Sequence, residues 1–111
     1  MTERHALVVR GGWEGHRPVE ATDLFLPFLE RSGFSVRVED SNEVYADRET
    51  MDRTDLIVQS VTMSDISAEA FQGLRGAVER GTGLAGWHGG IADSYRNNSD
   101  YLQLVGGQFA T

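Results

Sequence analysis

The segment Gly86-Trp87-His88-Gly89-Gly90 constrains the fold of this chain more than any other stretch of sequence. It has the G-x-H-x-G spacing of a nucleophile elbow, a sharp turn that joins a strand to a helix and displays one side chain above the carboxyl edge of a sheet. The turn crowds the backbone, so residues without a Cβ flank the displayed one. The pattern predicts a sheet with strand-to-helix connections, and it puts the imidazole of His88 in the displayed position.

Four short apolar stretches are typical of strands: residues 6–9, 34–40, 55–61 and 83–87. The stretch 34–40 alternates apolar and polar residues, which predicts a half-buried strand near a sheet edge. Residues 41–53 are polar and predict a loop with room for a short helix. Strands that alternate with helices form parallel sheets with helices on their faces, and such sheets bind ligands at the carboxyl ends of their strands.

Helical spacing of apolar residues appears after three of these stretches. The first helix begins near Pro18 and carries Leu24, Phe25, Phe28 and Leu29, and Pro27 should kink it or reset its start. Ser67 has the character of an N-cap for a second helix that ends at Gly81. A third, short helix is expected around residues 101–105, before Gly106-Gly107.

Composition excludes several classes of protein. The length of 111 residues fits a single domain. The chain has 10 basic and 17 acidic residues, and the resulting net charge of −7 disfavours nucleic acid and anionic membranes as partners. Cysteine is absent, so disulfides, thiolate metal sites and a cysteine-dependent amidotransferase activity are ruled out. No apolar run approaches the roughly 20 residues of a membrane span, and the polar N-terminus is not a secretory signal, so we expect a cytoplasmic protein.

Three groups of residues carry a resemblance to a known family: Arg10-Gly11-Gly12 with Gly15-His16-Arg17-Pro18, the segment 86–90, and residues 101–109 with their L-V-G-G-x-F pattern. Together they resemble the trehalose-utilisation (ThuA-like) family. The resemblance implies a flavodoxin-like, class I glutamine amidotransferase-like fold: a three-layer α/β sandwich with a mainly parallel sheet, spanning residues 1–111 as one domain. Family members usually continue beyond the phenylalanine that matches Phe109, so we expect this domain to be incomplete at its C-terminus.

His88 is the leading candidate for a catalytic residue, because an imidazole can act as a general base near neutral pH or bind a metal. His16 belongs to the loop after the first strand, which faces the same sheet edge, so the two histidines should approach each other. Two imidazoles and a carboxylate from Glu14 or Asp93 would suit a divalent metal such as zinc. Alternatively, His88 only stabilises its turn, and His16 is a surface residue that bonds to the backbone.

The neighbouring residues have candidate roles as well. Glu14 could take part in catalysis by holding His88 in one tautomer, or it could be a solvated loop acid. Trp13 could stack against a sugar, whereas we expect Trp87 to point inward. Backbone N–H groups at Gly12, Gly89 and Gly90 could bind the substrate. The chain contains no lysine and no P-loop, which disfavours nucleotides.

The resemblance to the ThuA-like family implies an enzyme of carbohydrate metabolism, related to trehalose or keto-sugars. With the histidine site, we expect a hydrolase-type or lyase-type activity on a small, polar, sugar-like metabolite. One alternative is a catalytically silent module that binds such a metabolite. Another is a fragment that works in a homo-oligomer or together with a complementing C-terminal half, because an incompletely covered sheet promotes association.

Overall fold

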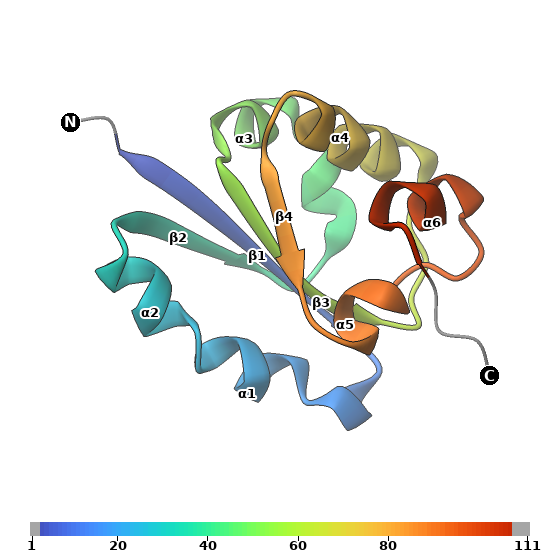
Figure 1. The fold of residues 1–111 in the computed structure, drawn as a ribbon, viewed down its shortest axis with the longest axis horizontal. Coiled ribbons are helices and arrows are strands. Elements are labelled where there is room, and N and C mark those ends of the chain that lie inside the picture. The colour runs from blue at the N-terminus through green and yellow to red at the C-terminus, as the bar shows by residue number, and fades with distance from the viewer. Residues whose placement is uncertain (1–2, 108–111) are drawn as a thin grey trace.

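A computed structural model describes residues 3–107 and confirms the predicted α/β fold (Figure 1). Its sheet has the strands β1 (Arg4–Gly12), β2 (Phe34–Glu39), β3 (Leu56–Thr62) and β4 (Gly83–Gly86). All of their pairings are parallel, and the strand order is β2-β1-β3-β4. The strand β2 therefore lies at a sheet edge, as its alternating sequence predicts.

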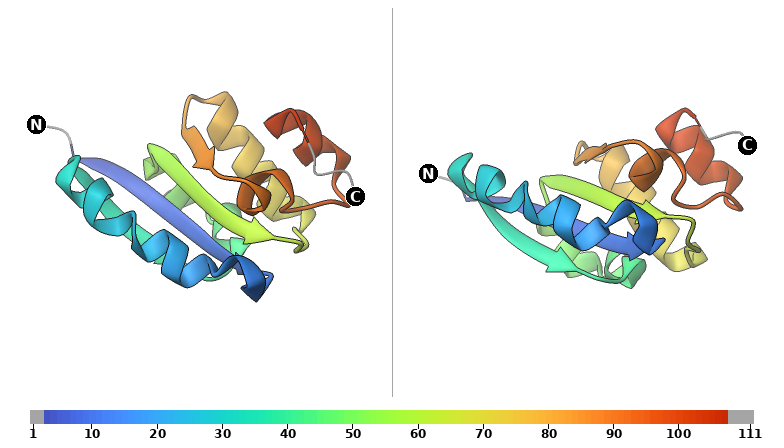
Figure 2. Two further views of the ribbon diagram at one scale, coloured as in Figure 1. Left: turned by 60° about the horizontal axis from the view of Figure 1, so that its bottom comes forward. Right: turned by 90° about the horizontal axis from the view of Figure 1, so that it is seen from below.

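Helices cover both faces of the sheet, which makes three layers (Figures 1 and 2). Among the described residues, one face carries α1 (Pro18–Asp23) and α2 (Leu26–Arg31). The other carries η2 (Asn42–Ala46), α3 (Arg48–Arg53), α4 (Ala68–Glu79) and α6 (Ser99–Val105). Two short elements, η1 (Glu14–His16) and α5 (Gly89–Ala92), follow the carboxyl ends of β1 and β4. None of the helices within residues 3–107 is long and apolar enough to cross a membrane.

Most local signals in the sequence act as predicted. The Ser67 hydroxyl caps α4 by accepting a hydrogen bond from the backbone N–H of Ala70, and Gly106 ends α6 in the left-handed conformation. The polar stretch 41–53 contains two helical elements, η2 and α3, rather than a loop with one. Pro27 resets the first helix, so that α2 begins anew with Pro27 in its first turn.

The break between α1 and α2 leaves apolar side chains in solvent. Leu29 is buried, but Leu24, Phe25 and Phe28 are 79%, 46% and 56% exposed. These three residues have helical spacing in the sequence, yet the chain is not one continuous helix there and they do not form a buried face. The two faces of the sheet are consequently unequal, since the cluster under α4 buries 13 residues and the cluster under α2 buries four.

The larger layer depends on one close backbone approach. A Cβ at Gly73 of α4 would lie 1.7 Å from the carbonyl oxygen of Tyr45 in η2. Glycine at this position allows α4 to pack directly against η2. Tyr45 itself is fully buried in the larger core, which the polar composition of its segment does not predict.

Candidate functional site

The turn after β4 has the geometry of an elbow. His88 adopts φ 50° and ψ −137°, a conformation that side-chain-bearing residues rarely take, and its side chain is exposed. The flanking glycines let the turn lie against β3. A Cβ at Gly86 would stand 2.7 Å from the carbonyl oxygen of Gln59, and one at Gly90 would stand 3.1 Å from the Cα of Ser60. The glycine spacing is thus explained by the packing of the elbow on the neighbouring strand.

His16 reaches the elbow from η1. Its ring centroid lies 5.4 Å from that of His88 in an edge-to-face arrangement, so the two histidines meet as the sequence predicts. The Nδ1 atom of His16 is 2.8 Å from the Oγ1 atom of Thr62, at the end of β3. This hydrogen bond holds the ring of His16 in place and leaves its Nε2 atom for other partners.

A cavity of about 190 Å³ opens at the carboxyl ends of the strands, between these histidines. Its described lining residues come from four segments of the chain. They are Trp13, His16, Thr62, Met63, His88, Gly89, Asp93 and Arg96. Trp13 is 50% exposed and its ring lies 4.8 Å from that of His16, so it offers an aromatic surface at the cavity. The predicted substrate-binding residues Trp13 and Gly89 therefore lie at one site with both histidines.

Asp93 lies in this cavity but already has a partner. Arg96 binds its carboxylate through two nitrogen atoms, and the bond from Nη2 to Oδ2 measures 2.9 Å. The hydrogen bond to Asp93 raises the pKa of Arg96. The pair places the carboxylate of Asp93, which is 6% exposed, beside a guanidinium that reaches the solvent. Its polar atoms are suited to binding hydroxyl groups.

The described residues do not form a complete metal site. Within residues 3–107, no group of three or more His, Cys, Asp or Glu side chains is placed to hold a metal ion. His16 and His88 supply two nitrogen ligands, fewer than the three protein ligands usual for catalytic zinc. Asp93 is committed to Arg96, and Glu14 does not line the cavity. These residues alone therefore do not fit zinc.

Three of the predicted site residues stand apart from the cavity. Glu14 is exposed on η1. A Cβ at Gly12 would lie 2.1 Å from the carbonyl oxygen of Thr62, so Gly12 is needed for the contact between β1 and β3. Gly90 is buried against Ser60. These three residues do not line the cavity between the histidines, and their roles stay predictions. Trp87 packs inward as expected, with its ring 5.0 Å from that of Phe25.

A buried polar network behind the elbow is not foreseen from the sequence. The side-chain oxygen of Gln59 accepts hydrogen bonds from the hydroxyl groups of Tyr45 and Tyr95, at 2.7 and 3.1 Å. Its nitrogen donates to Ser94 and Tyr101, at 2.9 and 2.8 Å. A glutamine in the middle of an apolar strand was the available signal, because a buried amide requires hydrogen-bond partners.

The network anchors the helix that follows the elbow. Ser94 donates to the carbonyl oxygen of Gly90, and Tyr101 donates to that of Ile91, at 3.0 and 2.6 Å. Because α5 has four residues, its last carbonyl groups lack partners within the helix. Burial raises the pKa of Tyr45, Tyr95 and Tyr101, so these hydroxyl groups stay protonated and can donate.

Comparison with known proteins agrees with this fold. The chain resembles a solved structure of a ThuA-like protein from Bacteroides uniformis ATCC 8492, with a TM-score of 0.73 and 21% sequence identity. The match covers 95% of this chain and 44% of the other, so the chain spans less than half the length of that relative. No match was found among curated proteins. The sequence profile of the ThuA family, described as trehalose utilisation, matches residues 5–111. The chain therefore belongs to the ThuA family.

Proposed function

We propose that the cavity between η1 and the elbow binds a small, polar, sugar-like metabolite, and that His88 acts on it as a general base. The observation that carries this proposal is the meeting of His16 and His88, 5.4 Å apart, over a cavity at the carboxyl edge of a parallel sheet. This edge is where such sheets bind ligands. The strained backbone of His88 supports it, because strain tends to persist at functional sites.

The lining residues favour a neutral, hydroxylated ligand. The exposed ring of Trp13 offers a surface for the C–H groups of a sugar ring, while Asp93 and Arg96 offer an acceptor and donors for its hydroxyl groups. In this arrangement His88 takes a proton from the bound ligand, and the bond to Thr62 keeps His16 oriented beside it. A hydrolase-type or lyase-type reaction of a trehalose-related or keto-sugar compound, in the cytoplasm, fits such a site and the description of the family.

Histidine resonances provide the test, because the three histidines of the chain lie at two different ends of the sheet. We would titrate the protein with trehalose, glucose and keto-sugars, and follow the imidazole signals by NMR. We expect shifts at His16 and His88, none at His5, and turnover that is lost in His88→Ala. Binding without turnover would favour the silent module. A complete lack of shifts at His16 and His88 would refute a sugar site.

We further propose that the thinly covered face of the sheet associates with a second copy of the chain. Leu24, Phe25 and Phe28 are exposed on this face, and Phe25 contacts Trp87 directly after β4. Within residues 3–107, the outer edge of β4 pairs with no strand, and its sequence Gly-Leu-Ala-Gly carries no charge to keep another edge away. Two copies related by a twofold axis could pair these edges and cover the apolar side chains. Sedimentation that shows a monomer at high concentration would refute this association.

A further inference from the structure

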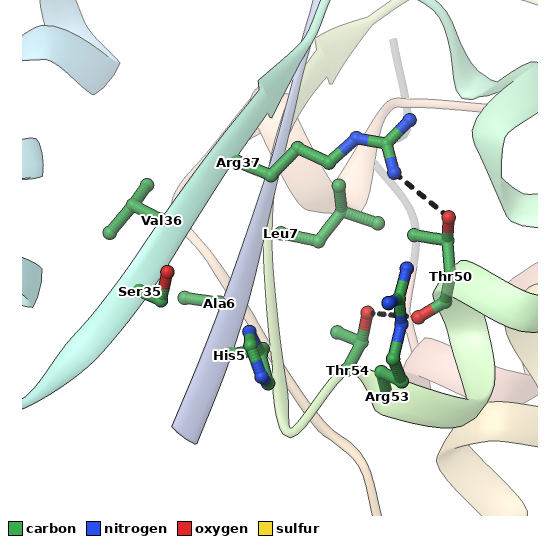
Figure 3. A pocket seen from close by; sticks show the side chains of 9 residues that line it. All are labelled: His5, Ala6, Leu7, Ser35, Val36, Arg37, Thr50, Arg53 and Thr54. Carbon is green, nitrogen blue, oxygen red and sulfur yellow. Dashed lines mark hydrogen bonds between the residues drawn. The ribbon is translucent and has the colours of Figure 1, made fainter. Parts of the chain in front are cut away.

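A second cavity lies at the opposite end of the sheet from the histidine pair. It has a volume of about 170 Å³ and opens between the amino ends of β1 and β2 and the helix α3 (Figure 3). Its polar lining consists of His5, Ser35, Arg37, Thr50, Arg53 and Thr54. Its described lining includes two arginines and a histidine but no Asp or Glu, in a chain with a net charge of −7. Carboxylates stand directly behind this lining, because Glu39 pairs with Arg37, Asp47 accepts a hydrogen bond from Thr50, and Asp55 accepts one from the backbone N–H of His5.

The helix α3 contributes one face to the cavity. Thr50, Arg53 and Thr54 are spaced at i, i+3 and i+4, so their side chains lie together on one side of the helix. Both threonines are buried, at 6% and 7% exposure, and Thr54 donates a 2.8 Å hydrogen bond to the carbonyl oxygen of Thr50. The hydroxyl groups are therefore fixed at the wall of the cavity, with Arg53 beside them (Figure 3).

Arg37 reaches the same place from β2. It donates from Nη1 to the hydroxyl oxygen of Thr50 and from Nε to the carboxylate of Glu39, at 2.8 Å each. Thr50 in turn donates to Asp47 at 2.7 Å. These bonds use two of the five N–H groups of the guanidinium and hold it in position. Its charge is largely offset by Glu39, but its remaining donors are available to a ligand.

Arg53 supplies charge that is not offset. No ion pair joins it to any residue within the described range 3–107. Two guanidinium groups that face one cavity, one held by a hydrogen-bond chain and the other unpaired there, form a suitable environment for an anion with several oxygen atoms. Guanidinium groups recognise such anions through paired hydrogen bonds.

We propose that this cavity binds a phosphate group, either free or as the ester of a small metabolite. Arg53 provides a charge that has no ion pair within residues 3–107, Arg37 provides the fixed donors, held in place by its hydrogen bond to Thr50, and the site works separately from the histidine cavity. Removing the charge of Arg53 should weaken phosphate binding by roughly tenfold or more, in line with the strength of hydrogen bonds to charged groups.

The experiment measures binding by calorimetry at constant pH and ionic strength, with chloride replaced stepwise by inorganic phosphate. Arg53→Gln tests the site, and Arg48→Gln is the matched control, because Arg48 lies on the same helix with a side chain that is 86% exposed. We expect binding to the parent protein and to Arg48→Gln, and a loss of at least tenfold in Arg53→Gln. Equal affinities in all three proteins, or no binding to the parent protein, would overturn the proposal.

NMR separates this site from the sugar site in the same protein. Phosphate should shift the imidazole signal of His5 and leave those of His16 and His88 unchanged, which is the reverse of the pattern expected for sugars. A sugar monophosphate that shifts His5 more strongly than inorganic phosphate would identify an ester as the ligand. An unphosphorylated sugar that shifts His5 equally would overturn the assignment of a phosphate site.

Discussion

The strain at His88 predicts an unusual order of stability between two substitutions. His88→Gly and His88→Ala both remove the imidazole and all of its contacts, so the two variants differ only in the Cβ atom. At φ 50° and ψ −137° a Cβ is unfavourable, whereas glycine adopts this region readily. We therefore expect the glycine variant to be the more stable one, opposite to the usual order for these residues.

The magnitude follows from two opposing terms. A side-chain-bearing residue in such a sparsely populated region costs about 1–3 kcal/mol. Glycine reduces this advantage by about 0.4–1 kcal/mol, because the unfolded chain of the glycine variant has more conformational freedom to lose on folding. The difference favours His88→Gly by about 1.3 kcal/mol at the midpoints of the two ranges, and by about 0–2.6 kcal/mol across them. Urea unfolding followed by circular dichroism resolves a difference of this size through the transition midpoint.

Asn97 offers a matched control in the turn before α6. It is exposed, and it is not among the described non-glycine residues with positive φ, which are Arg17, Met63 and His88. Here Asn97→Ala should be more stable than Asn97→Gly by about 0.4–1 kcal/mol. If His88→Ala equals or exceeds His88→Gly in stability while the control behaves as expected, the backbone of the elbow is not strained and our reasoning is wrong.

Further predictions concern packing, pH and association. Gly73→Ala should destabilise the protein severely in urea unfolding, because its Cβ would meet the backbone of η2 at 1.7 Å. On the same helix, the Cβ of Gly76→Ala would meet the flexible end of an arginine at 3.1 Å, and this variant should be more stable than the parent protein by up to about 1 kcal/mol. Burial raises the pKa of Tyr45, so the folded protein holds the phenol proton more tightly than the unfolded chain does. The contribution of this proton to the free energy of unfolding should be fully present below about pH 10, the pKa of an unfolded phenol, and should be lost as the pH rises above it. Tyr45→Phe should lower stability at pH 8 but make the alkaline decline shallower, and an unchanged slope would contradict this linkage. Leu24→Glu should reduce any self-association seen by sedimentation, while Glu69→Gln on the opposite layer should not, and equal association of both variants would exclude this face as the interface.

Much of the fold was predictable because its signals are local. Apolar runs, the cap at Ser67 and the glycine that ends α6 each act within a few residues of sequence, and the structure places the elements accordingly. The exposure of Leu24 and Phe28 was not predictable in this way, because it depends on where the chain resumes its helix after the break before Pro27. The Gln108 and Phe109 part of the family pattern lies outside the described residues.

The meeting of the two histidines in the candidate site could be predicted from the sequence, but the side-chain contacts that hold the site together could not. The parallel topology brings His16 and His88 to one edge, since both follow the carboxyl ends of strands. The partner of Asp93 and the hydrogen bond from His16 to Thr62 depend on side-chain directions that spacing does not fix. The catalytic role of His88, its support by Glu14 and the binding of a metal stay predictions.

The buried amide of Gln59 sets one direction for every hydroxyl proton around it. Tyr45 and Tyr95 must point their hydrogens toward the amide oxygen, while Tyr101 and Ser94 receive hydrogens from its nitrogen and turn their own toward α5. Rotating this one amide by half a turn would oblige all four hydroxyl groups to reverse. The hydrogen bonds of this network are therefore satisfied together in one orientation of the Gln59 amide. Through Ser94 and Tyr101, that orientation is linked to the backbone of α5, directly after the residue that presents the imidazole.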